Sequence, residues 1–431
     1  MSQKKMRAKA FYSGFPYAHD TYLALSKASD GKLYYNLSSE RLDVGGQLYS
    51  FDPQTDTITF LADLTDVCGE KDRRAIPQGK SHVEFYEADG KLFFGTHVGF
   101  YEMIEGMERL PQNPPEGYGL YPGGHFLSYD LQTGAVTRLG LMPDSEGILS
   151  MAMDTDLRQI YAISWPTGMF VHLDLTTGAL REIGPVSARG EAGEVGKDYR
   201  VLCRSLLVDP DTGIVYLSNA EGDILFYDPK VGGPLQVLDD VNLRLDYFGK
   251  YDPTQPGSMG YNWRKVLWHK REGVAYGTHG NSGYLFRFDP KGRKLELVDR
   301  LCSLPSKRSG MFDQFSYGYL GLQFGPDGDT LYYLTGGPVI RDGKRLEGER
   351  QIAKGGAKGL ENLHLITYQV SENRYTDHGA IYYSDGSIPT YVNSIAIDDL
   401  GKAYALARMQ TSVGEIQDLI RIEPESNANG L

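Results

Sequence analysis

Short apolar segments alternate with polar turns along this chain, the pattern expected of β-hairpins. A first apolar segment leads through a turn such as Asp209-Pro210-Asp211-Thr212-Gly213 into a second segment rich in Tyr, Phe and Leu. A third segment then ends in a turn such as Tyr129-Asp130-Leu131-Gln132-Thr133-Gly134. In the middle of the chain, the first strands are expected over 82–86, 149–153, 205–208, 265–268 and 320–324.

This unit recurs seven times, which predicts an all-β fold: a seven-bladed β-propeller of four-stranded antiparallel blades, with residues 1–431 as one domain. The first repeat has strands over 21–26 and 33–37. The last has strands over 391–397, 402–408 and 419–422, and little chain remains for a fourth. Residues 9–12 can supply that strand, so the N-terminus is expected to close the ring.

The repeats carry long insertions, and these are expected on one face of the propeller. The insertions cover 102–122, 189–199, 246–261, 306–317 and 338–359. Each of them precedes a first strand or joins a second strand to a third, and both kinds of connection lie on the same face of a propeller. Long loops on one face of a rigid scaffold usually build a binding site.

Polar residues at the matching strand ends are therefore expected to meet at one mouth. The starts of first strands contribute His19, His82, Arg204, Arg264, Tyr319 and Asn393. The ends of second strands contribute His97, Trp165, Asn219 and His279, and His125 opens a third strand. The alternative for any one of these side chains is that it only satisfies backbone groups of a loop.

Composition narrows the classes of partner. A formal net charge of -12 disfavours nucleic acid, because phosphate binding needs a basic surface. The three cysteines, Cys68, Cys203 and Cys302, are far apart and suggest neither a disulfide framework nor a structural zinc site. The basic N-terminus leads into no apolar stretch, which predicts a cytoplasmic protein without a membrane span, or a periplasmic or secreted one if a leader was removed. The protein is expected to be a monomer.

The expected mouth favours one kind of chemistry. Asp20, Asp313, Glu40 and Glu221 form no evident facing pair of the kind that ordinary glycosidases use, and the chain has no GxSxG element for acyl transfer. Several histidines with two arginines suit β-elimination from a uronic acid. An arginine neutralises the carboxylate and so acidifies the C5 proton, and histidine or tyrosine removes that proton and protonates the leaving oxygen.

A metal site is a second interpretation of the same histidines. Three imidazoles from one blade, His82, His97 and His125, could converge on a divalent ion, although their spacing matches no compact ligand motif. Elimination itself requires no cofactor, and a divalent ion at these histidines would be catalytic or structural.

Four segments resemble those of a known group of enzymes: Phe15-Pro16-Tyr17-Ala18-His19-Asp20-Thr21-Tyr22, Gln78-Gly79-Lys80-Ser81-His82, Gly95-Thr96-His97-Val98-Gly99 and Tyr121-Pro122-Gly123-Gly124-His125-Phe126. Together they look like the seven-bladed propeller enzymes that act on L-rhamnose-α-1,4-D-glucuronate, the cap of arabinogalactan proteins and gum arabic. The group contains polysaccharide lyase family 42, which works at the anterior mouth, and the rhamnosidases of glycoside hydrolase family 145, which use a posterior histidine. The posterior turn of the first blade, 27–32, lacks a histidine, so the lyase is favoured.

The resemblance also implies roles. Arg204 and Arg264 would hold the glucuronate carboxylate, and His82 and His97 would be base and acid in either order, with Tyr319 or Tyr121 as a substitute for one of them. The substrate-binding positions would be His19, His125, Trp165, Asn219, His279 and Tyr121. The partner is then an oligosaccharide or polysaccharide. The remaining hypothesis, a carbohydrate-binding propeller without catalysis, would favour aromatic and neutral polar groups over a cluster of His and Arg.

Overall fold

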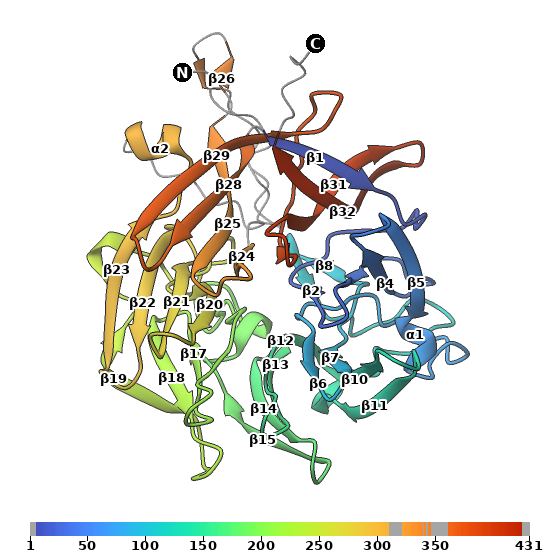
Figure 1. The fold of residues 1–431 in the computed structure, drawn as a ribbon. Helices are drawn as coiled ribbons and strands as arrows, with labels where there is room; N and C mark the ends of the chain where they lie inside the picture. The colour runs from blue at the N-terminus through green and yellow to red at the C-terminus, as the bar shows by residue number, and fades with distance from the viewer. Residues whose placement is uncertain (1–5, 310–320, 339, 342–343, 346–360, 425–431) are drawn as a thin grey trace.

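The computed structural model describes residues 6–309, 321–338, 340–341, 344–345 and 361–424. Within these ranges, β-sheets are arranged in a ring (Figure 1). Five sheets have four strands each, and an eight-stranded sheet contains two further blades joined at their outer edges. The protein is therefore a seven-bladed β-propeller, as the repeats predict.

Within each blade the strands follow one another in chain order from first to fourth, except where the ring closes. The first three blades consist of β2 (Leu25–Lys27), β3 (Leu33–Leu37), β4 (Gln47–Asp52) and β5 (Thr57–Asp63); β6 (Tyr86–Ala88), β7 (Lys91–Gly95), β10 (His125–Asp130) and β11 (Val136–Leu141); and β12 (Gly147–Asp154), β13 (Gln159–Trp165), β14 (Met169–Asp174) and β15 (Ala179–Pro185). The fourth and fifth consist of β16 (Leu207–Val208), β17 (Val215–Ser218), β18 (Asp223–Tyr227) and β19 (Gln236–Asn242); and β20 (Trp263–His269), β21 (Val274–His279), β22 (Tyr284–Asp289) and β23 (Lys294–Arg300).

The last two blades show how the ring closes. They consist of β24 (Leu322–Phe324), β25 (Thr330–Pro338), β28 (Glu361–Gln369) and β29 (Arg374–Tyr382); and β30 (Ala396–Ile397), β31 (Ala403–Thr411), β32 (Gly414–Pro424) and β1 (Met6–Phe11). The N-terminal strand β1 pairs antiparallel with β32, from Met6 opposite Pro424 to Phe11 opposite Leu419. The predicted closure by the N-terminus is confirmed, three residues earlier than expected.

Acidic residues after the third strands explain the recurring turn. The carboxylate of Asp52 accepts the backbone N–H of Gln54 at 2.8 Å, and Asp130 and Asp174 do the same for residues two positions on, at 3.0 and 2.8 Å. This hydrogen bond stabilises a tight turn, which is why Asp is favoured there. The residue before each of these aspartates is an aromatic or a leucine and is buried. Two adjacent residues therefore contribute to the turn and to the core.

Four of the first strands are shorter than the sequence predicts. The strands β2, β6, β16 and β30 begin between two and five residues late, at Leu25, Tyr86, Leu207 and Ala396. Near the axis, the preceding residues bond to neighbouring blades: the N–H of Leu23 donates to the carbonyl of His82 at 3.3 Å. These segments therefore leave the ladder and face the centre of the ring.

The connections contain short elements of their own: the hairpin β8 (Glu102–Ile104) and β9 (Met107–Arg109), the hairpin β26 (Ile340–Arg341) and β27 (Lys344–Arg345), α1 (Leu64–Val67), α2 (Leu304–Ser309), η1 (Pro143–Ser145), η2 (Gly190–Ala192) and η3 (Asp246–Phe248). In the part of the chain that the structure describes, no helix has the length and apolar character needed to cross a bilayer. Most residues of the two insertions predicted at 306–317 and 338–359 lie outside the described residues.

A buried carboxylate in the closing blade makes stability depend on pH. Asp418 of β32 accepts hydrogen bonds from both the N–H and the hydroxyl of Ser13, each 2.7 Å long, and burial raises its pKa to about 6. Because folding raises this pKa, the protonated carboxyl of Asp418 favours the folded state. Its contribution to the free energy of unfolding is therefore lost as pH rises through about 6, by about 3 kcal/mol in all. Between about pH 4 and about pH 7, the free energy of unfolding measured by urea titration should therefore decrease less in Asp418→Asn than in the parent protein. Equal decreases in the two proteins would contradict this.

Candidate active site

A cavity of about 490 Å³ opens among the connections of the first five blades. The segments before the first strands β2 and β6 supply Tyr22 and His82. Trp165 ends the second strand β13, and His97 follows the second strand β7. The remaining walls come from the predicted insertions: residues 105–109 of the β8–β9 hairpin, Glu191, Val195, Tyr199 and Pro256–Gly257, together with Tyr101 and Arg204. The loop-rich face therefore holds the cavity, as the strand register predicts.

The centre of the cavity wall is a pair of imidazoles. The rings of His82 and His97 meet edge to face with centroids 4.2 Å apart, and His82 stacks on Tyr22 at 4.4 Å. Trp165 packs against His97 from the other side, at 5.3 Å. Among the described residues, Nε2 of His82 and Nδ1 of His97 have no hydrogen-bond partner. Buried polar groups are normally bonded, so exceptions of this kind point to a functional site.

Both imidazoles are held in the neutral form. Burial lowers the pKa of His82 and of His97 well below the ordinary value, because it removes water from the charged form. The positive charges of Lys80 and Arg204 lower both pKa values further, and His97 adds to the effect on His82. A neutral imidazole near neutral pH can accept a proton, which is the state required of a general base.

Lys80 is buried behind this pair and is fixed by several contacts. Its backbone exchanges two hydrogen bonds with His97, of 3.0 and 2.7 Å, which places the two residues side by side. Its ammonium pairs with Glu40 at 3.0 Å and lies 4.7 Å from the ring centroid of Tyr101. The lysine thus places a positive charge near both imidazoles without lining the cavity itself.

Replacing Lys80 should change the titration of the imidazoles. Lys80→Met removes a charge that disfavours imidazolium, so the pKa of His82 and of His97 should rise in NMR titrations of the ring protons. Lys265→Met is the matched control, because Lys265 is equally buried but pairs with Glu84 instead. An unchanged or lower pKa in Lys80→Met would contradict this electrostatic role.

Arg204 lies beside the imidazole pair and is held by Glu191. Its Nη2 atom is 2.6 Å from Oε1 of Glu191, and that carboxylate also accepts the indole N–H of Trp165 at 2.8 Å. Arg109 links the β8–β9 hairpin to the same η2 loop by donating to the backbone carbonyls of Glu191 and of Gly193, the latter at 3.2 Å. These contacts give the cavity two guanidinium groups in fixed positions.

Two residues expected at the mouth belong instead to a buried network. The Nε2 atom of His125 lies 2.7 Å from the carboxylate of Glu70, which also accepts the amide N–H of Gln78 at 2.9 Å. Tyr121 donates its hydroxyl to the same Gln78 at 2.7 Å. His125 and Tyr121 do not line the cavity, because both side chains are buried within this network.

Three further candidates lie away from the cavity. Asn219 bonds Asp223 across the β17–β18 turn, with distances of 2.8 and 3.1 Å, which is the structural role weighed above for such residues. His279 stacks on Phe248 at 4.1 Å, and burial lowers its pKa to about 3. Arg264 is buried with its Nη1 atom 2.7 Å from the sulfur of Met259.

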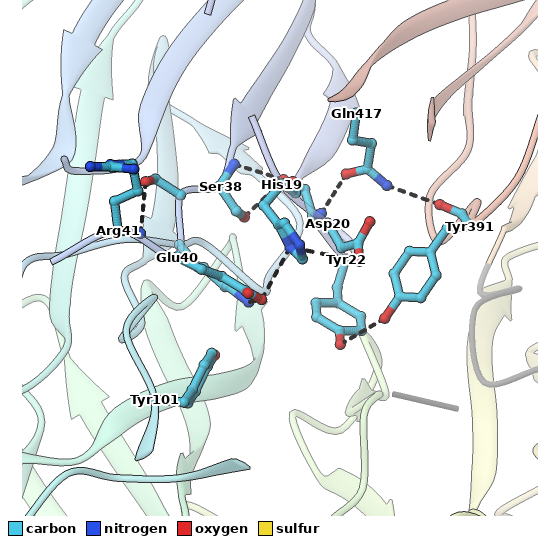
Figure 2. Close-up of polar contacts among 12 residues, drawn as sticks. His19, Asp20, Tyr22, Ser38, Glu40, Arg41, Tyr101, Tyr391 and Gln417 are labelled. Carbon is cyan, nitrogen blue, oxygen red and sulfur yellow. Dashed lines mark hydrogen bonds and ion pairs between the residues drawn. The ribbon is translucent and has the colours of Figure 1, made fainter. Parts of the chain in front are cut away.

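His19 lies close to the site without lining it. Its Nδ1 atom is 3.1 Å from the carboxylate of Glu40, the same carboxylate that pairs with Lys80 (Figure 2). The ring is about one-third exposed. Tyr319 lies outside the described residues. Of the eleven predicted positions, the cavity therefore brings together His82, His97, Trp165 and Arg204.

The metal interpretation needs three imidazoles at one point, and the geometry does not provide them. His82 and His97 are adjacent, but His125 is engaged by Glu70. Across the described ranges, no group of three or more His, Cys, Asp or Glu side chains is placed to hold a metal ion.

Sequence reasoning missed several residues of the site. Three of them are Tyr22, Lys80 and Tyr101, which lie within or next to the motifs Phe15–Tyr22, Gln78–His82 and Gly95–Gly99. Their closeness in sequence to the histidines of these motifs could have indicated them. Glu191 and Arg109 come from the insertions, about which the register of the blade strands carries no information.

Comparison with known proteins identifies no family for this sequence. No family model matches the sequence, and no curated protein matches it. Among solved structures, a chain of the "Crystal Structure of Mitotic Checkpoint Complex" is similar to this chain at 12% identity, with a TM-score of 0.46 over 95% of this chain and 91% of that one. The fold and the site together define a β-propeller with a cavity on its loop-rich face.

Proposed function

We propose that the protein is a polysaccharide lyase that cleaves L-rhamnose-α-1,4-D-glucuronate ends of arabinogalactan-type glycans by β-elimination. The observation that carries the proposal is the meeting, in one cavity, of a neutral imidazole pair, the tyrosine Tyr22 and the guanidinium of Arg204. Elimination from a uronate needs a base, a proton donor and a cation for the carboxylate, and these side chains can supply all three.

The base and the donor must approach from one side of the sugar. In a glucuronate linked through O4, the C5 hydrogen and the O4 oxygen are gauche to each other, so a syn elimination uses groups on a single face of the ring. His82 and Tyr22 are stacked neighbours and fit this requirement. We therefore assign His82 as the base and Tyr22 as the acid, with His97 supporting His82 through their edge contact.

The proposed step balances as follows. His82 takes the C5 proton, the C5–H electron pair forms the C4–C5 double bond, and the C4–O4 bond breaks. Tyr22 gives its proton to the departing oxygen of rhamnose, and transfer of a proton from His82 to Tyr22 restores the site. The products are free rhamnose and a glycan that ends in an unsaturated uronate.

Arg204 is assigned to the glucuronate carboxylate. A guanidinium has five N–H donors in a planar fork, so a pair with Glu191 through Nη2 is compatible with donation to a substrate on the cavity side. Neutralising the carboxylate lowers the barrier to removal of the C5 proton and stabilises the enolate-like charge that follows. Arg264 and Tyr121 have no place in this assignment, because neither lines the cavity.

The size and lining of the cavity favour a short chain end. A volume of about 490 Å³ lies within the range of sites for small ligands, roughly 300–1,000 Å³. Trp165 and Tyr101 offer aromatic surface on which an apolar face of a sugar, such as that of rhamnose with its methyl group, can stack.

The test is incubation with gum arabic while ultraviolet absorbance and free rhamnose are followed together. Elimination creates a conjugated unsaturated uronate, so both signals should rise in equal molar amounts. A gum whose carboxylates have been reduced to alcohols is the matched control and should give neither signal. Rhamnose without the chromophore would contradict elimination and favour an exo-α-L-rhamnosidase, and neither product would favour a binding protein.

A further inference from the structure

Tyr391, just before β30, adopts a backbone conformation that an aromatic residue rarely takes. Its φ angle is +53°, in the left-handed region that favours glycine. Two residues further on, the amide of Asn393 is fully buried, and neither of its polar atoms has a hydrogen-bond partner among the described residues. Strained and unsatisfied segments persist where their surroundings over-determine them, often at functional sites.

Two side chains from the last blade hold Tyr391 against the chain that leads to β2. Arg408 lies over its ring, 4.4 Å from the centroid, and donates two hydrogen bonds, of 2.8 and 2.5 Å, to the carboxylate of Asp20. Gln417 donates to the carbonyl of Tyr391 at 2.9 Å and accepts the N–H of Thr21. Both bridges therefore join the same two segments, one through an ion pair and one through an amide.

The result of this clamp is a contact between two hydroxyl groups. The Oη atoms of Tyr22 and Tyr391 are 3.3 Å apart (Figure 2). Tyr22 lines the cavity and stacks on His82, whereas Tyr391 is buried and does not line it. Burial, aided by the neighbouring Tyr22 and Asp20, raises the pKa of Tyr391 well above its ordinary value, so its hydroxyl keeps its proton.

We propose that Tyr391 is a positioning residue that aims the hydroxyl of Tyr22 at the substrate and stabilises the oxygen of Tyr22 when its proton leaves. The inference rests on the proposed function, in which Tyr22 protonates the departing O4 oxygen. As that proton is transferred, negative charge develops on the Tyr22 oxygen, and the hydroxyl of Tyr391 donates a hydrogen bond to it. The contacts of Arg408 and Gln417 with Tyr391 hold it in the strained conformation and so maintain this geometry.

The test is Tyr391→Phe, which keeps the ring, its burial and the contact with Arg408 and removes only the hydroxyl. We expect kcat on the rhamnose-capped uronate to fall about tenfold or more, because a hydrogen bond to developing charge is lost, while KM is unchanged. Tyr383→Phe is the matched control, because that hydroxyl donates to the backbone carbonyl of Arg408 at 2.7 Å and the residue does not line the cavity. Equal kcat values in the two variants, or a rise in KM alone in Tyr391→Phe, would overturn the proposal.

A second measurement separates this inference from the proposed function. In protein with isotope-labelled tyrosine, the NMR resonance of the Tyr22 ring carbon that bears the hydroxyl should shift in Tyr391→Phe and stay in place in Tyr383→Phe. This NMR measurement requires no turnover, so it tests the contact between the hydroxyl groups of Tyr22 and Tyr391 even if the parent protein proves inactive on uronates. An unmoved Tyr22 resonance in Tyr391→Phe would overturn the positioning role.

Discussion

His82→Ala is expected to abolish elimination, with kcat lowered by about 10²–10⁴-fold, the range that a general base contributes. The neutral imidazole of His82 stacks on Tyr22, burial lowers its pKa, and its Nε2 atom has no hydrogen-bond partner among the described residues. Initial rates of chromophore formation on rhamnose-capped uronate give the comparison, at saturating substrate.

His172→Gln is the control for this loss. His172 is also buried and packs between Tyr161 and Tyr227, but it lies in β14, away from the cavity. Its variant should keep the parent rate once folding has been verified by thermal unfolding. If His82→Ala retained more than about a tenth of the parent kcat, the assignment of the base would be wrong.

Arg204→Lys is expected to lower kcat/KM by about 10²-fold, although the charge is retained. Lysine offers a point charge where a planar fork is needed for the carboxylate, and its shorter reach also weakens the pair with Glu191 that orients Trp165. Full saturation curves on the uronate substrate measure this effect.

Arg200→Lys provides the comparison. Arg200 lies four residues before Arg204, forms a similar ion pair with Glu221 and does not line the cavity. Its kcat/KM should stay within about twofold of the parent value, the range of a neutral surface change. Equal effects of the two substitutions would show that Arg204 serves the loop and has no special role toward a carboxylate.

The fold was predictable because its signals are local. Each carboxylate at the end of a third strand binds backbone two residues on, so the turn is encoded within a few positions, and Asp52 and Asp130 are examples. Strand order then assigns connections to faces, which predicts that His97 and Trp165 lie on one mouth of the propeller, and both line the cavity. The starts of first strands were less predictable, since those residues bond across blades, as Leu23 does to His82.

The site was predicted only in part, because register gives the end of a strand and not the direction of a side chain. His97 and His279 occupy the same position in their tripeptides, yet the first faces the cavity while Phe248 stacks over the second. Phe248, in η3, is distant in sequence from His279. Likewise Glu70 is distant in sequence from His125, which it engages. Which partner covers a strand-end histidine is decided by such tertiary contacts.

The source of the oxygen atom in the released sugar is the most direct test of the central claim. Elimination breaks the C4–O4 bond without water, and rhamnose leaves with the bridging oxygen it already carried. Digestion in heavy-oxygen water, quenched before anomeric exchange and analysed by mass spectrometry, should therefore give unlabelled rhamnose together with a uronate lighter by one water than its hydrolytic counterpart. Rhamnose carrying the heavy isotope beside a saturated glucuronate would contradict the lyase.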